Sequence, residues 1–391
     1  MRVKKWVERS RARILPYSEE KPRFGTLEEE LKELHLELTY ACNLQCRMCD
    51  IWSKPRREPK TARQEMSCEE IAQHVQQSKL LQNIHLVILS GGEPFLKKGF
   101  AELTADFLNN FPQTSVGILS NFYNSQLISN SLKEIQEKSG VRRLWIGTSL
   151  DGMEQLHDNT RGTPGAFRHF CETLQLMTKE FPTIPVTVNY TLTTDNYHDL
   201  FSVYRFCRSN HMSFSAQFPV PWKDAEIFTF TAQQLSEIEQ QIFKIIEDEI
   251  DDFESGKIDE NSLLVKIFYL QGMIDYHRNP RRVFKKCVGG RKFATFSPEG
   301  QVYSCPILKR LTLGNLREQP FDEIWAGAAA GKLRQKIDQG FCHCWLNCTI
   351  YPNAGEALSG IPRKLTVAKL SYLAFWARNT FGSWFKTGSS D

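Results

Sequence analysis

The 391-residue sequence lacks the features that mark several common classes of protein. No run approaches 18 uninterrupted apolar residues, so no membrane-spanning helix is expected. The 49 Lys and Arg residues nearly balance the 45 Asp and Glu residues, and a formal charge of +4 is too small to indicate nucleic acid as an obligate partner. No secretory signal is recognised at the amino terminus. These absences favour a cytoplasmic globular protein.

Cysteine is abundant by comparison, with eleven residues. In a chain without a secretory signal they indicate a reducing compartment, where thiols bind metal or lie buried. The length of the chain favours a main domain of about 200 to 250 residues and a smaller second domain.

Three of these cysteines, Cys42, Cys46 and Cys49, lie within eight residues. Three thiolates so close can hold three irons of a [4Fe–4S] cluster, which leaves the fourth iron open to a substrate or cofactor. Structural zinc is an alternative, but it needs four ligands, and the nearest candidates are Asp50 and the more distant His35. A disulfide framework is disfavoured because three is an odd number of thiols.

The middle of the chain alternates between strand and helix patterns. Apolar, β-rich runs predict six strands at residues 35–40, 85–90, 115–120, 143–150, 186–191 and 213–218. Helical patterns lie between them at residues 68–81, 100–110, 126–139, 166–180 and 199–209. This alternation predicts an α/β fold with a parallel sheet and right-handed crossovers.

Small and polar residues follow several of these strands. Gly91 and Gly92 would let the backbone approach a ligand closely, although a glycine pair is also an ordinary turn. Asn121 and Ser149 offer small hydrogen-bonding side chains at strand ends, and the fork of Arg161 suits a carboxylate. An ion pair between Asp158 and Arg161 at the start of a helix is the structural alternative.

The CxxxCxxC order of Cys42, Cys46 and Cys49 resembles the signature of the radical S-adenosylmethionine (SAM) enzymes. In that family the amino and carboxylate groups of SAM chelate the open iron. One electron from the reduced cluster then cleaves SAM to a 5′-deoxyadenosyl radical, which takes a hydrogen atom from the substrate. The resemblance implies a partial (β/α)6 TIM-like barrel, and a flavodoxin- or ferredoxin-type electron donor.

The resemblance also implies a set of SAM-binding residues. The stretch Gly91, Gly92, Glu93 and Pro94 resembles the family's GGE motif, which contacts the methionine amino group. Asn121 and Ser149 are candidates for the ribose hydroxyls and the carboxylate, and Ser149 and Arg161 for holding the SAM carboxylate.

A second group of cysteines lies near the carboxyl terminus. Cys287 and Cys305 flank two short strand patterns joined by a Ser-Pro-Glu-Gly turn, which predicts a hairpin. Cys342, Cys344 and Cys348 follow, so five thiols are available for a four-thiolate site. The region resembles the SPASM and twitch domains of radical SAM enzymes, although the full seven-cysteine SPASM pattern is absent.

That resemblance implies one auxiliary [4Fe–4S] cluster. Cys287, Cys305 and Cys348 are the strongest candidate ligands, either Cys342 or Cys344 is the fourth, and His343 is a weaker rival. Structural zinc stays an alternative. A fully cysteine-ligated cluster favours an electron role, and therefore an oxidative reaction.

The expected organisation has five parts. They are a lead-in at 1–34, the barrel at 35–220, a helical linker at 221–280, a small carboxyl-terminal SPASM/twitch-like domain at 281–355 and a tail at 356–391. The tail interleaves aromatic and basic residues, as in an interfacial helix on the inner face of a membrane or a helix packed on the barrel.

We therefore predict a radical SAM enzyme that oxidatively modifies a peptide or protein. One alternative is oxidation or rearrangement of a sugar, cyclitol or lipid-linked small molecule. Another is a zinc-stabilised binding protein without catalysis. The sequence assigns no catalytic side chain that acts on the substrate.

Overall fold

The computed structural model describes residues 31–219, 228–284 and 287–359. The lead-in before residue 31 and the basic, aromatic tail lie outside the described residues. The chain divides into two compact units. Among the described residues, the barrel unit comprises 31–219, 228 and 288–339, and the helical unit comprises 229–284, 287 and 340–359.

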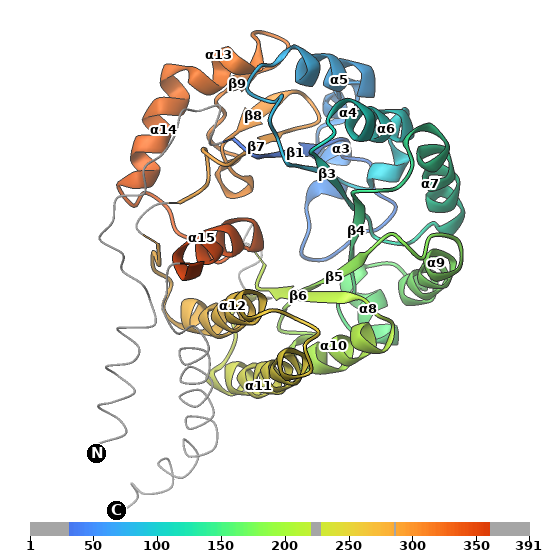
Figure 1. Cartoon of the computed structure of the whole chain (residues 1–391), viewed down its shortest axis with the longest axis vertical. Coiled ribbons are helices and arrows are strands. Elements are labelled where there is room, and N and C mark those ends of the chain that lie inside the picture. Colours follow the sequence, from blue (N-terminus) through green and yellow to red (C-terminus); the bar gives the residue numbers. More distant parts are fainter. Residues whose placement is uncertain (1–30, 220–227, 285–286, 360–391) are drawn as a thin grey trace, which may run out of the picture. The chain divides into compact units, whose positions relative to one another are not determined.

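The barrel unit is built on one sheet whose first six strands are parallel and neighbour one another in chain order. They are β1 (Glu33–Glu37), β2 (Leu86–Ser90), β3 (Ser115–Leu119), β4 (Leu144–Ser149), β5 (Val186–Thr191) and β6 (Ser213–Gln217). Figure 1 shows the strands following one another from β6 to β1. All six predicted strands are present, and the parallel α/β fold is confirmed.

Three further strands extend the sheet beyond β1. They are β7 (Phe293–Phe296), which is parallel to β1, then β8 (Gln301–Tyr303) and β9 (Gly314–Asn315), which are antiparallel. The predicted hairpin is β7–β8, with Thr295 opposite Tyr303. Its pairing with β1 was not predicted, and it places the hairpin beside the loop that follows β1. The described sheet stays open, with β6 and β9 as its edges.

Helices connect the parallel strands and lie along the outside of the sheet (Figure 1). They are α5 (Cys68–Gln77), α6 (Phe100–Asn110), α7 (Ser125–Ser139), α9 (Ala166–Glu180) and α10 (Leu200–Ser209), with α8 (Glu154–Arg161) between β4 and α9. Shorter elements are η1 (Ile51–Ser53), α3 (Lys54–Arg57), α4 (Pro59–Arg63), η2 (Pro94–Leu96), η3 (Tyr197–Asp199) and η5 (Pro306–Leu308). After β9 come α13 (Phe321–Ala326) and α14 (Ala328–Asp338). Helix α8 was not predicted.

One face of the sheet carries a row of residues in register: Ile88, Gly117 and Trp145. A Cβ atom at Gly117 would lie 2.3 Å from the Trp145 ring, so the indole occupies the space that a side chain at position 117 would need. Glycine in a β-strand often marks such a close approach. The bulky ring thereby fills this face between the strands.

The helical unit contains α11 (Ala232–Glu254), α12 (Glu260–Arg278) and α15 (Asn347–Ser359). Trp345, just before α15, packs where Gly272 of α12 leaves room, because a Cβ atom at Gly272 would lie 2.2 Å from the indole. Its Nε1 donates to the carbonyl of Tyr269, 3.0 Å away. The indole thus fixes the segment of Cys342, Cys344 and Cys348 to α12. Within the described part of the chain, no helix combines the length and apolar character needed to cross a membrane.

Candidate active site

The loop that follows β1 carries Cys42, Cys46 and Cys49, and the structure holds its backbone from two sides. On one side, the amides of Gly92 and Glu93 donate to the carbonyls of Thr39 and Ala41 at 2.7 and 2.8 Å. On the other, Gln45 donates to the carbonyl of Arg161 at 3.2 Å. Cys46 is buried and the other two thiols are half-buried. The loop is therefore fixed at the carboxyl ends of the strands, where barrel enzymes place their active sites.

Glycines allow these close backbone approaches. A Cβ atom at Gly92 would lie 2.1 Å from the Ala41 carbonyl oxygen, and one at Gly91, whose φ is +126°, would lie 2.5 Å from that of Thr39. Gly162 has a φ of +63°, and a Cβ atom there would lie 2.2 Å from the Gln45 carbonyl oxygen. Each contact is with backbone, so a side chain at these positions could not be accommodated by moving a rotamer.

Glu93 is fully buried beside the cysteine loop. Its carboxylate accepts from the backbone amide of Asn121 at 2.8 Å, the hydroxyl of Ser120 at 3.3 Å and the backbone amide of Phe95 at 3.4 Å. Burial raises the pKa of Glu93 to about 7, although these hydrogen bonds oppose the shift. Among the described residues its donors are all uncharged, so this carboxylate suits a ligand that brings a cation.

Asn121, Ser149 and Pro94 complete the sequence-predicted group. The side-chain nitrogen of Asn121, Nδ2, donates to Asn43 Oδ1 at 2.7 Å and lies 3.7 Å from Cys42 Sγ. Ser149 ends β4 opposite Asn189 of β5. Pro94 is buried at the start of η2. The structure therefore joins Asn121 directly to the cysteine loop and places Ser149 at the same end of the sheet.

Arg161, the last residue of α8, is buried and forms an ion pair with Asp151, which is completely buried. The alternative ion pair with Asp158 is wrong. Asp158 instead accepts from the backbone amides of Gly165 and Phe167 at the start of α9, at 2.5 and 2.8 Å. Arg161 Nη1 lies 3.5 Å from Cys46 Sγ, so the guanidinium faces the cysteine loop.

The three thiols of this loop are the predicted ligands of a cluster. Burial raises the pKa of Cys42 and that of Cys49 to about 11, so a metal is needed to ionise them at neutral pH. No three His, Cys, Asp or Glu side chains converge on one metal ion anywhere in the described residues. A cube takes each thiolate at a different iron, so thiols that do not converge on one point can still hold one.

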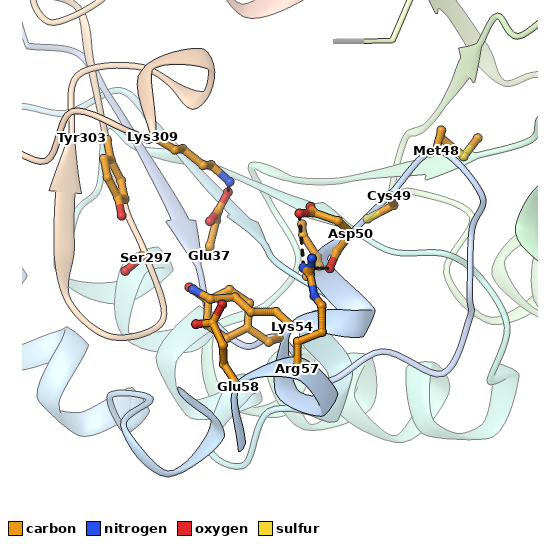
Figure 2. A pocket seen from close by; sticks show the side chains of 12 residues that line it. Glu37, Met48, Cys49, Asp50, Lys54, Arg57, Glu58, Ser297, Tyr303 and Lys309 are labelled. Carbon is orange, nitrogen blue, oxygen red and sulfur yellow. Dashed lines mark hydrogen bonds and ion pairs between the residues drawn. The ribbon is translucent and has the colours of Figure 1, made fainter. Parts of the chain in front are cut away.

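A cavity of about 400 Å³ adjoins Cys49 on the side of the β7–β8 hairpin (Figure 2). Three acids and three bases line it: Glu37, Asp50, Glu58, Lys54, Arg57 and Lys309. Figure 2 shows Lys309 pointing toward Glu37, its ion-pair partner, and Arg57 toward Asp50, with 3.5 Å between Arg57 Nη2 and Asp50 Oδ2. The cavity is thus polar and balanced in charge.

Two residues of this wall, Tyr40 and Lys54, form a hydrogen-bonded group with Glu299 that sequence analysis missed. Lys54 Nζ lies 2.9 Å from Glu299 Oε1 and 2.7 Å from the Tyr40 hydroxyl, and that hydroxyl donates to Glu299. Tyr40 follows β1, Lys54 follows the cysteine loop and Glu299 lies in the β7–β8 turn. The three residues meet because β7 pairs with β1, and their sequence carries no signal of that pairing.

The cysteines of the second group are divided between the two units. Cys287, Cys342, Cys344 and Cys348 belong to the helical unit, and Cys305, at the start of η5, belongs to the barrel unit. Burial raises the pKa of Cys344 to about 11, and its Sγ lies 3.1 Å from the Thr349 hydroxyl. His343 Nδ1 lies 2.7 Å from the Tyr276 hydroxyl.

An open parallel barrel with three thiols after its first strand and a Gly-Gly-Glu turn after its second defines a radical SAM enzyme. The chain belongs to this superfamily. Residues 36–207 match the Radical SAM superfamily model, and residues 287–349 match that of an iron–sulfur cluster-binding domain, SPASM. Its cofactors are therefore SAM, a [4Fe–4S] cluster and auxiliary iron–sulfur.

Named relatives differ in what they make. The AdoMet-dependent heme synthase of Methanosarcina barkeri is 26% identical over 75% of this chain and 81% of its own length. The sporulation killing factor maturation protein SkfB of Bacillus subtilis is 28% identical over 79% of this chain and 68% of its own. The structure of Streptococcus suis SuiB bound to precursor peptide SuiA has a TM-score of 0.54 at 16% identity, covering 78% of this chain and 67% of SuiB. At that identity the likeness to SuiB shows the fold.

Acid should destabilise the protein through His157. This residue is buried, and its Nδ1 accepts from the Asp151 amide at 3.0 Å, so the folded state requires a neutral ring. Burial, and then the charge of Arg161, lower the pKa of His157 well below its usual value. The unfolded state therefore binds the extra proton first, and stability present above about pH 6.5 is lost as the pH falls.

His157→Asn, whose amide oxygen can accept the same hydrogen bond, should weaken this dependence. Urea unfolding of the metal-free protein at about pH 7.5 and about pH 5.5, on either side of the ordinary histidine pKa, measures the free energy of unfolding. An equal loss of stability in wild type and variant would show that His157 is not the group responsible.

Proposed function

We propose that the enzyme oxidatively modifies a peptide or protein by taking a hydrogen atom from it. The observation that carries the proposal is the cavity beside Cys49, whose wall has equal numbers of acidic and basic side chains. Peptides present amide groups and side chains of both signs, which such a wall can pair. A porphyrin with several carboxylates would instead favour an excess of positive charge and a broad apolar slot.

The chain's own residues would divide the work at this site. Cys42, Cys46 and Cys49 would hold the cluster, Gly91, Gly92, Glu93 and Pro94 would form the turn that binds SAM, and the Glu93 carboxylate would pair with its amino group. Asn121 and Ser149 offer hydrogen bonds to its polar groups. When bound, cluster and SAM together supply a carbon radical that takes a hydrogen atom from an unactivated C–H bond. A small electron-transfer protein, of flavodoxin or ferredoxin type, would provide the electron.

The auxiliary cluster held by the second group of cysteines would accept the electron that an oxidation of the substrate releases. Cys287, Cys305 and Cys348, with Cys342 or Cys344, are the proposed ligands of one auxiliary [4Fe–4S] cluster. Trp345 supports this role, because it fixes the segment of Cys342, Cys344 and Cys348 to α12. A tightly held ligand segment suits an electron acceptor that must keep its potential during turnover.

SkfB, named as the maturation protein of a sporulation killing factor, supports the peptide substrate. The heme synthase supports a tetrapyrrole instead. The test incubates the reconstituted enzyme anaerobically with SAM and dithionite, and adds either peptides encoded by short reading frames beside its gene or an iron porphyrin.

Mass spectrometry should find a peptide that has lost two hydrogen atoms, formed together with 5′-deoxyadenosine. A modified porphyrin and unchanged peptides would contradict the proposal. Enzyme lacking the first cluster, prepared from a Cys42/Cys46/Cys49→Ala variant, is the matched control and should leave both substrates unchanged.

A further inference from the structure

A buried ion pair lies directly behind the cysteine loop. Arg161 is 9% exposed and Asp151 is 0% exposed, and the two side chains pair through Arg161 Nη2. The other terminal nitrogen, Nη1, lies 3.5 Å from Cys46 Sγ, within hydrogen-bonding distance of sulfur. A permanent positive charge therefore faces the thiol that the sequence motif assigns to the cluster.

The pair is held by the strands and by the helix that follows them. Asp151 Oδ1 accepts from the Thr191 amide at 2.7 Å, at the end of β5. The Asp151 carbonyl accepts from the side-chain amide of Asn196 at 3.1 Å. Arg161 ends α8, and its own carbonyl accepts from Gln45 in the cysteine loop at 3.2 Å. Because both ends are anchored, the guanidinium cannot turn away from Cys46 without breaking this network.

We propose that Arg161 is a positioning residue that raises the reduction potential of the cluster held by Cys42, Cys46 and Cys49, and that Asp151 limits this effect. Reduction adds a negative charge to the cluster. A nearby cation that donates to a ligand sulfur stabilises the reduced form, and an anion opposes it. Both charges are shielded from water, so their effect on the cluster is larger than it would be at the surface.

The polar contact to Cys42 differs from the one that Arg161 makes to Cys46. Asn121 also donates toward a ligand sulfur, that of Cys42, but it is uncharged and lies farther away, at 3.7 Å. The interaction of Arg161 with Cys46 is the charge-assisted one of the two, and such hydrogen bonds are about twice as strong as neutral ones.

This role differs from holding the carboxylate of SAM, the function that the sequence suggests for Arg161. Both terminal nitrogens of its fork have partners, Asp151 and Cys46, and among the described residues the third donor, Nε, is buried and has none. A carboxylate-binding residue would change the affinity for SAM and leave the potential of the SAM-free cluster unaltered. A residue acting on Cys46 would change that potential before any SAM is added. The proposal holds whether the substrate is a peptide or a small molecule.

The test is a redox titration of the reconstituted, SAM-free enzyme followed by electron paramagnetic resonance. Subtracting the spectrum of the Cys42/Cys46/Cys49→Ala variant removes the auxiliary signal. Arg161→Gln should lower the potential, with the electron bound at least tenfold more weakly, which is about 59 mV for a one-electron couple. Asp151→Asn should raise it. Arg168→Gln removes an exposed arginine that pairs with Glu172 and should leave the potential unchanged.

Opposite shifts in the two variants distinguish an electrostatic role from a structural one, which would move both potentials in the same direction. If Arg161→Gln fails to hold its cluster, Asp151→Asn decides: a higher potential supports the proposal and an unchanged or lower one overturns it. An unchanged potential in Arg161→Gln, with weaker binding of SAM, would assign the residue to the SAM carboxylate and also overturn the proposal.

Discussion

Cys46→Ala should abolish the formation of 5′-deoxyadenosine from SAM. Cys46 is the most buried thiol of its loop, and a cube held by only two protein thiolates would be lost or left incomplete. Anaerobic assay with dithionite, together with the iron content of the purified variant, measures both effects. We expect a loss of about four irons, one cluster's worth, and product below detection.

Cys171→Ala is the matched control for this substitution. Its thiol is half-buried in α9, outside both groups of cysteines. This variant should keep its iron and its activity. Product formation by Cys46→Ala at the wild-type rate would show that the cysteine loop does not hold the catalytic cluster.

Gly92→Ala should displace the cysteine loop without removing any ligand. The new methyl group would sit 2.1 Å from the Ala41 carbonyl oxygen, and the hydrogen bonds from Gly92 and Glu93 to that segment would be strained. Overpacking typically destabilises by about 1–3 kcal/mol, and we expect the upper end of this range because the clash is with backbone on both sides. Denaturant unfolding of the metal-free protein gives the free energy, and reconstitution gives the loss of iron.

Gly331→Ala tests the specificity of that result. Gly331 lies in α14, and a Cβ atom there would meet nothing within 4 Å. Alanine in an open helical position should stabilise by about 0.5–1 kcal/mol. Equal effects of the two substitutions would show that close approach to the cysteine loop is not what requires glycine at position 92.

The repeating part of the fold could be predicted because its signals are local. Runs such as residues 186–191, which form β5, alternate buried and partly exposed positions, and amphipathic helices such as α6 separate them. Helix α8 was missed because it has only eight residues and even its buried positions, His157, Thr160 and Arg161, are polar, so it shows no apolar stripe. The pairing of β7 with β1 was missed because contacts between residues about 260 positions apart leave no local pattern.

In the site as well, features encoded by a contiguous stretch were predicted and those that depend on distant contacts were not. The cysteine loop and the Gly-Gly-Glu turn are contiguous motifs, and the structure brings them together as their adjacent strands require. The structural alternative for Arg161, an ion pair with Asp158, was wrong. Asp158 is closer in sequence, but the amides at the start of α9 occupy it, whereas Asp151 is aimed at Arg161 by the end of β4. The hydrogen-bonded group of Tyr40, Lys54 and Glu299 depends on the β1–β7 pairing and could not be foreseen.

Counting the clusters tests the central claim most directly. Iron and sulfide analysis with electron paramagnetic resonance should give about eight irons for the reconstituted wild type and about four for the Cys42/Cys46/Cys49→Ala variant, since each cube holds four. Only the wild type should form 5′-deoxyadenosine. A wild type with no iron–sulfur signal, or a variant that still cleaves SAM, would contradict the assignment of a catalytic cluster to the loop after β1.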